Sequence, residues 1–167
     1  EIFPDAKFLF LSRNGWDTCA SIDRWSTRLG TDNVGEKHDW WGVNRRKWDL
    51  LVEQIIPKHA DLAPHIDILR DLPDGRAMAA TEWIVTMREG LRLLKSYPNE
   101  VLHVPYESLC NAPREMYESI AQFAGLKDDL VFLDYAEKVL KPVAPREEFE
   151  LPAALETPFR ETINALA

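Results

Sequence analysis

A short apolar run near the start of the chain, residues 7–12, constrains the fold more than any other feature. Turn residues enclose it, with Pro4-Asp5 before it and Asn14-Gly15 after it. Its length and its flanks favour a buried strand over a helix. A helix is predicted to follow at once, over residues 16–29, with Asp17 in the first turn, where negative charge suits the helix dipole. The segment 7–29 is therefore predicted to be a strand, a tight turn and a helix.

Helical periodicity dominates the chain after this segment. Apolar residues recur at helical spacing from Trp48 to Ile56, where Pro57 ends the helix, and again from Ala80 to Leu94. A second strand is predicted at residues 101–104, and further helices at residues 113–124 and 128–140. The remainder, residues 143–167, is predicted to be a surface tail, without regular structure in its Pro- and Glu-rich part up to Pro158.

Strands that are separated by long helical stretches indicate an α/β fold with a parallel sheet and helices packed outside it. Two strands are too few for such a sheet. The chain opens Glu1-Ile2-Phe3-Pro4, without Met, and enters a strand almost immediately. We therefore expect a single domain over residues 1–167 that is incomplete at its N-terminus, with the remaining strands before Glu1.

The charge balance excludes one class of partner. With 28 acidic against 20 basic residues the net charge is −8, whereas a sequence-independent nucleic-acid binder needs a basic face. A small anionic ligand needs only a few local cations. Two cysteines are too few for a disulfide framework or the usual zinc site. No apolar run approaches the roughly 18 residues of a membrane span, so we expect a cytoplasmic protein.

Arg13 is the first candidate site residue, because ligands of open α/β sheets bind beyond the carboxyl ends of the strands. Asn14-Gly15 leads into a helix whose N-terminal amides and dipole favour an anion, and the guanidinium fork of Arg13 suits phosphate. Ser21 lies eight residues after Arg13 and can share a helix face with Asp17. Taken alone, such an Arg is often a surface ion-pair partner and such a Ser is merely tolerated. The joint pattern favours a phosphate site.

Other candidates carry less weight. His38 is predicted to be an exposed loop residue, with a catalytic role as the alternative, and His59, His65 and His103 lack partners at metal-ligand or triad spacing. The pair Trp40-Trp41 has two open interpretations. It forms an acceptor-binding lip together with Arg45, Arg46 and Lys47, or it packs into the core beside a solvated helix start.

Two blocks of the sequence resemble the sulfotransferases that use 3′-phosphoadenosine-5′-phosphosulfate (PAPS). Residues 3–21 resemble the family's 3′-phosphate motif, a strand followed by Arg-(Asp/Asn)-Pro, an acidic residue and a Ser eight positions after the Arg. The matching residues are Arg13, Asn14, Asp17 and Ser21, and Gly15 replaces the usual Pro. Residues 101–126 resemble the family's later strand and its Tyr-Glu-x-Leu … Pro … Phe-x-Gly-Leu stretch.

The resemblance implies a P-loop-NTPase-like three-layer fold that transfers a sulfuryl group from PAPS to a hydroxyl or amine acceptor without a metal. It assigns Arg13 and Ser21 to the donor's 3′-phosphate and Tyr106 to the neighbourhood of the adenine. The acceptor can be a small molecule, a glycan, a lipid or a peptide, and the oligomeric state stays open.

The family's 5′-phosphosulfate loop has no match here, since Thr31 to Lys37 lacks the spacing and the strand context of such a loop. The catalytic residues are therefore unassigned, and we expect them before Glu1, so that this chain alone binds half a cofactor and is inactive. The family's basic C-terminal segment is also missing, with Arg146 or Arg160 as candidate substitutes. Two alternatives remain, a P-loop kinase of small molecules and a catalytically inactive nucleotide-binding or scaffold module.

Overall fold

The structure is a computed structural model that describes residues 5–26, 38–127, 129–144 and 147–167, with the backbone alone for His38 and Asp39. The fold is mixed α/β and mainly helical, with a small parallel sheet. The described residues group into two compact units. Unit 1 takes in the described residues within Glu1–Asn14 and Glu89–Pro145, and unit 2 takes in those within Gly15–Arg88 and Arg146–Ala167.

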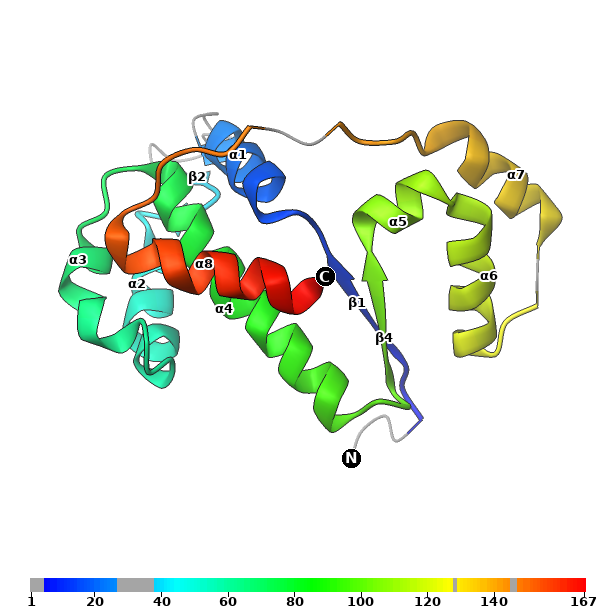
Figure 1. Ribbon diagram of the computed structural model, residues 1–167, viewed down its shortest axis with the longest axis horizontal. Helices are drawn as coiled ribbons and strands as arrows, with labels where there is room; N and C mark the ends of the chain where they lie inside the picture. The colour runs from blue at the N-terminus through cyan, green and yellow to red at the C-terminus, as the bar shows by residue number, and fades with distance from the viewer. Residues whose placement is uncertain (1–4, 27–37, 128, 145–146) are drawn as a thin grey trace. The chain divides into compact units, whose positions relative to one another are not determined.

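Unit 1 is built on the two predicted strands, β1 (Phe8–Ser12) and β4 (Val101–Pro105). They pair in parallel, with Phe8 opposite Val101 and Ser12 opposite Pro105, and they lie side by side in Figure 1. The predicted parallel pairing is thus confirmed. It brings the carboxyl ends of both strands to one edge of the sheet.

The prediction that the first strand is buried is wrong for most of its large side chains. Phe8, Leu9 and Leu11 are each more than half exposed. Within the described residues the parallel sheet has two strands, so β1 has a strand neighbour on one side. The Phe10 ring is covered by Gly90 of α4 (Gly75–Ser96), where a Cβ would collide with the ring. Only a glycine permits this close approach.

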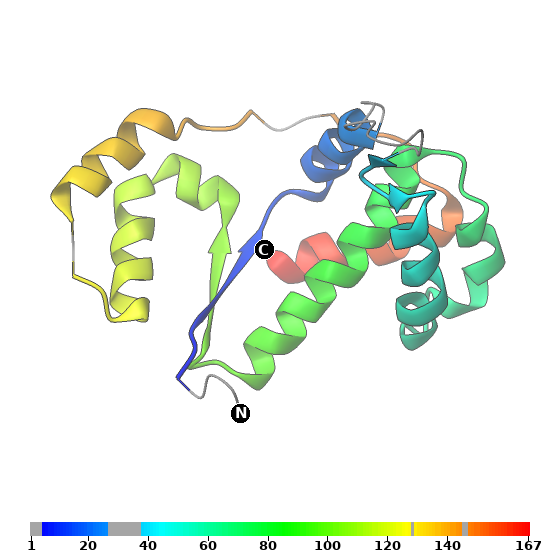
Figure 2. The same cartoon turned by 180° about the vertical axis from the view of Figure 1, so that it is seen from behind.

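After β4, the described part of unit 1 continues with α5 (Tyr106–Asn111), α6 (Pro113–Ala124) and α7 (Leu130–Val139). Figure 2 shows these helices from behind. The predicted helix from Pro113 is confirmed, and it ends at Gly125, whose φ of 68° is left-handed. Asp129 caps α7 by accepting hydrogen bonds from the amides of Val131 and Phe132.

Unit 2 begins with α1 (Gly15–Ser26), which confirms the predicted helix as far as Ser26; the predicted continuation to Leu29 lies outside the described residues. The hairpin of β2 (His38–Asp39) and β3 (Gly42–Val43) comes next. The predicted helix from Trp48 is split into α2 (Arg46–Leu50), a π-helical stretch (Leu51–Ile55) and a 3₁₀ turn (Ile56–Lys58). A 3₁₀ turn (Ala63–His65) and α3 (Ile66–Arg70) complete the segment before α4.

The predicted surface tail is wrong over its second half. Ala153–Leu166 form a helix, α8, which lies beside α4 in both ribbon views. Leu155, Phe159 and Thr162 are buried on it, at spacings of four and three residues. The ring of Phe159 packs against Trp83 at 4.8 Å between centroids. This apolar face, rather than helix propensity, holds the segment in place despite Pro158.

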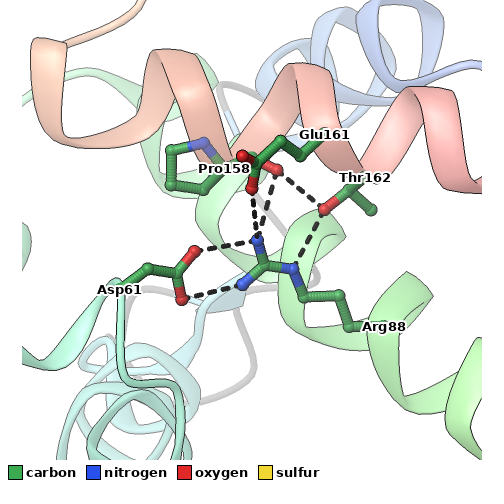
Figure 3. A network of polar contacts seen from close by, with 5 residues as sticks. All are labelled: Asp61, Arg88, Pro158, Glu161 and Thr162. Carbon is green, nitrogen blue, oxygen red and sulfur yellow. Dashed lines mark hydrogen bonds and ion pairs between the residues drawn. The ribbon is translucent and has the colours of Figure 1, made fainter.

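Arg88 ties α4 to α8 and to the turn at Asp61 (Figure 3). Its guanidinium donates two hydrogen bonds to the carboxylate of Asp61, at 2.9 and 2.8 Å, and its Nε donates to the hydroxyl of Thr162 at 3.1 Å. The hydroxyl of Thr162 in turn donates to the carbonyl of Pro158 at 2.7 Å. The hydrogen bond from Arg88 holds the pKa of Asp61 below its ordinary value.

Candidate anion-binding site at the ends of the parallel strands

Arg13 and Tyr106 occupy corresponding places after the two parallel strands. Arg13 follows Ser12, the last residue of β1, and Tyr106 follows Pro105, the last residue of β4. Since Ser12 and Pro105 are register partners, the two following residues are neighbours at the carboxyl edge of the sheet. This edge is where open α/β sheets bind their ligands.

The side chains of Arg13 and Tyr106 meet there. The guanidinium carbon of Arg13 lies 5.1 Å from the centre of the Tyr106 ring, within the range of a cation–π interaction. Both residues are half-buried. The ring thus restricts the guanidinium to part of its rotamer space, which lowers the entropy lost when that group binds an anion.

The phenol of Tyr106 is oriented by its own helix. A hydrogen bond with the thiol of Cys110, one turn further along α5, raises the pKa of Tyr106, and the nearby Arg13 opposes this shift without reversing it. The phenol therefore stays protonated at neutral pH. Both cysteines are free and buried, and burial raises the pKa of Cys19, so its thiol stays protonated as well.

Glu107 also belongs to this site, although no role was predicted for it. The backbone N–H of Asn14 donates to Oε1 of Glu107 at 2.8 Å. We expected the amides of this turn to be exposed and open to an anion, but this one is occupied by a carboxylate. The signal available in the sequence was the position of Glu107, an acidic residue directly after Tyr106 at the end of a predicted strand.

A second polar link between the strands lies just before Arg13. The hydroxyl of Ser12, which is buried, lies 2.7 Å from Nε2 of His103, and the imidazole stacks on Phe10 at 5.0 Å between centroids. Burial lowers the pKa of His103. His103 was predicted to lack a partner at triad spacing, and the parallel pairing supplies one from 91 residues away. Because the Ser12 hydroxyl is buried, this pair joins the strands rather than presenting a nucleophile.

Ser21 lies in unit 2, on α1, and it is half-buried. The helix places it four residues after Asp17 and on the same face, as predicted. Arg13 belongs to unit 1. The shared grip of Arg13 and Ser21 on one phosphate therefore stays a prediction from their spacing.

The predicted aromatic lip separates into two parts. Trp41 is buried against Trp48, at 5.5 Å between ring centroids, as the core-packing alternative expects. Trp40 is exposed, and its indole N–H donates to Glu82 at 2.6 Å. Lys47 pairs with the same carboxylate at 2.6 Å and lies 4.2 Å from the Trp40 ring. The ammonium of Lys47 is thus already engaged within the chain.

Arg160 is similarly engaged. Its guanidinium binds Glu148 at 2.8 Å and Glu156 at 2.6 Å, and it lies 5.5 Å from the ring of Trp16. Two carboxylates neutralise the charge that a substitute phosphate ligand would need. Arg146, the side chain of His38 and the stretch from Thr31 to Lys37 lie outside the described residues.

Among the residues that the structure describes, no group of three or more His, Cys, Asp or Glu side chains is arranged to hold a metal ion. Within the same residues, no helix has the length and apolar character needed to cross a membrane.

No family model, curated protein or solved structure matches the chain. The chemistry of the site itself indicates what it can bind. It presents one oriented guanidinium at the edge where a parallel sheet binds ligands, which suits an oxyanion such as a phosphate group.

Proposed function

We propose that this chain binds the 3′-phosphate end of PAPS through Arg13, as the nucleotide-binding part of a sulfotransferase with a P-loop-like α/β fold. The observation that carries the proposal is the placement of Arg13, at the carboxyl end of β1 and against the ring of Tyr106 at the carboxyl end of β4. Tyr106 is assigned to the neighbourhood of the adenine and Ser21 to the same phosphate as Arg13, both by the resemblance of the two sequence blocks.

The reaction needs a nucleotide that is held firmly while a sulfuryl group leaves it. An acceptor oxygen or nitrogen attacks the sulfur, the bond from sulfur to the donor's 5′-phosphate oxygen breaks, and the acceptor proton passes to a base. The departing product is 3′-phosphoadenosine-5′-phosphate (PAP). Arg13 contributes binding and orientation at the far end of the nucleotide. The base and the ligands of the 5′-phosphosulfate are not assigned to residues of this chain.

The proposal is tested by comparing PAP with 5′-AMP, which lacks the 3′-phosphate. We expect PAP to raise the melting temperature of the chain more than 5′-AMP does at equal concentration, since ligands stabilise by mass action. Arg13→Ala removes a charge-assisted contact worth about 1.5–3 kcal/mol and is expected to abolish the difference. Arg13→Lys keeps the charge but loses the two-pronged guanidinium, so this variant should retain part of the difference between PAP and 5′-AMP.

Arg92→Ala is the matched control. Arg92 is an exposed arginine of the same unit that, among the contacts described, pairs only with Glu89 in the preceding helical turn. It should leave the difference between the two nucleotides unchanged. Equal stabilisation of the unmodified chain by PAP and 5′-AMP would contradict the assignment of Arg13 to the 3′-phosphate.

A further inference from the structure

Glu107 holds the peptide unit that follows Arg13. Its carboxylate accepts the N–H of Asn14 at 2.8 Å, and the bond is partly buried. A hydrogen bond to an ionised acceptor is about twice as strong as one between neutral groups. Since 93 residues separate the two partners in sequence, this contact fixes the turn from outside its own segment.

The planarity of the peptide bond turns this contact into a constraint on Arg13. The N–H of Asn14 and the carbonyl of Arg13 lie in one rigid plane. Fixing the direction of that N–H therefore fixes the rotation about the Cα–C bond of Arg13. The direction in which the Arg13 backbone leaves β1 is thus determined by a side chain of α5.

Tyr106 completes the constraint on the side chain. Tyr106 and Glu107 are the first two residues of α5, and they contact Arg13 and Asn14 respectively. The two residues after β4 thus contact the two residues after β1. Tyr106 contacts Arg13 through its ring face, and Glu107 accepts a hydrogen bond from Asn14. The register of Ser12 with Pro105 places both pairs side by side.

Glu107 contributes both a hydrogen bond and a negative charge to this site, and substitutions can separate the two. A carboxylate at the edge of an anion site also repels the ligand. Glutamine has the same shape and can accept the same N–H without the repulsion. Methionine has a similar volume but only a weak acceptor. The two substitutions therefore separate the hydrogen bond from both charge and size.

We propose that Glu107 is a positioning residue that orients the Arg13 turn for the 3′-phosphate, so that it sets the preference for 3′-phosphorylated adenine nucleotides. The inference rests on the proposed function of Arg13. It predicts that Glu107 acts on the 3′-phosphate alone and leaves the affinity for 5′-AMP unchanged.

The test measures dissociation constants of PAP and 5′-AMP by calorimetry for the unmodified chain and its variants. Glu107→Met should lower the ratio of the 5′-AMP constant to the PAP constant about tenfold, which corresponds to about 1.4 kcal/mol. Glu107→Gln should keep this ratio within about twofold, less than about 0.5 kcal/mol. Glu118→Met, at an exposed position of α6, is the control and should keep the ratio. Should Glu107→Met not fold, Glu107→Ala takes its place.

Three results would overturn the inference about Glu107. If the unmodified chain prefers PAP and Glu107→Met keeps that preference, Glu107 has no positioning role while the proposed function stands. If both Met and Ala variants fail to fold, Glu107 is a structural residue and the inference is overturned. If the unmodified chain shows no preference for PAP, the proposed function fails, and the inference fails with it.

Discussion

Arg13 owes its surroundings to residues that are remote in sequence. Its identity as a candidate could be predicted locally, from a strand, a turn and a helix within 23 residues. Its contacts with Tyr106 and, through Asn14, with Glu107 follow instead from the parallel pairing of β1 with β4. Sequence spacing does not reveal which side chains meet across strands. For this reason no role was predicted for Glu107, and His103 was predicted to lack a partner at metal-ligand or triad spacing.

His103 provides a test of this pairing through pH. Burial lowers its pKa in the folded chain, so the unfolded chain takes up the proton first as the pH falls. Stability is therefore fully present above the ordinary pKa of about 6.5 and decreases as the pH falls from there through the folded pKa.

We expect the free energy of unfolding to fall more between pH 7.5 and pH 5.5 for the unmodified chain than for His103→Gln. Glutamine cannot titrate, but it can still bond to Ser12. Urea unfolding at the two pH values measures the difference. An equal fall in both proteins would show that folding does not lower the pKa of His103.

Among the secondary-structure elements, helices with a clear apolar stripe could be predicted from the sequence, whereas α8 could not. The stripe from Ala80 to Met87 is buried on α4 as expected. In α8 the stripe of Leu155, Phe159 and Thr162 is interrupted by Pro158 and flanked by glutamates, which suggested a surface segment. Tertiary packing on Trp83 outweighed the local composition.

The attachment of α8 to α4 depends on Arg88, which bridges Asp61 and Thr162. Arg88→Met should lower the free energy of unfolding by about 2 kcal/mol, because it removes charge-assisted hydrogen bonds and leaves Asp61 without its guanidinium. Arg92→Met is the control and should cost less than about 0.5 kcal/mol, since its ion pair with Glu89 is exposed. Similar losses for the two variants in urea unfolding would contradict the role of Arg88.

At the scale of the whole molecule, the sequence predicted an α/β chain with parallel strands, and both features are confirmed. The predicted burial of β1 was wrong for most of its large side chains. An apolar run is typical of a strand in a buried sheet, but it does not show how many strands or helices cover that strand. The sulfotransferase fold and activity remain proposals. An acidic chain with a net charge of −8 binds an anion only where local groups overcome the overall repulsion, and Arg13 is the group proposed for that role.

The most direct test of this assignment is a crystal structure of the chain with bound PAP. We expect oxygens of the 3′-phosphate to lie beside Tyr106 and within about 3 Å of the guanidinium nitrogens of Arg13, at hydrogen-bond distance. A structure in which the 3′-phosphate is held by other cations, with Arg13 turned away from it, would contradict the assignment of Arg13.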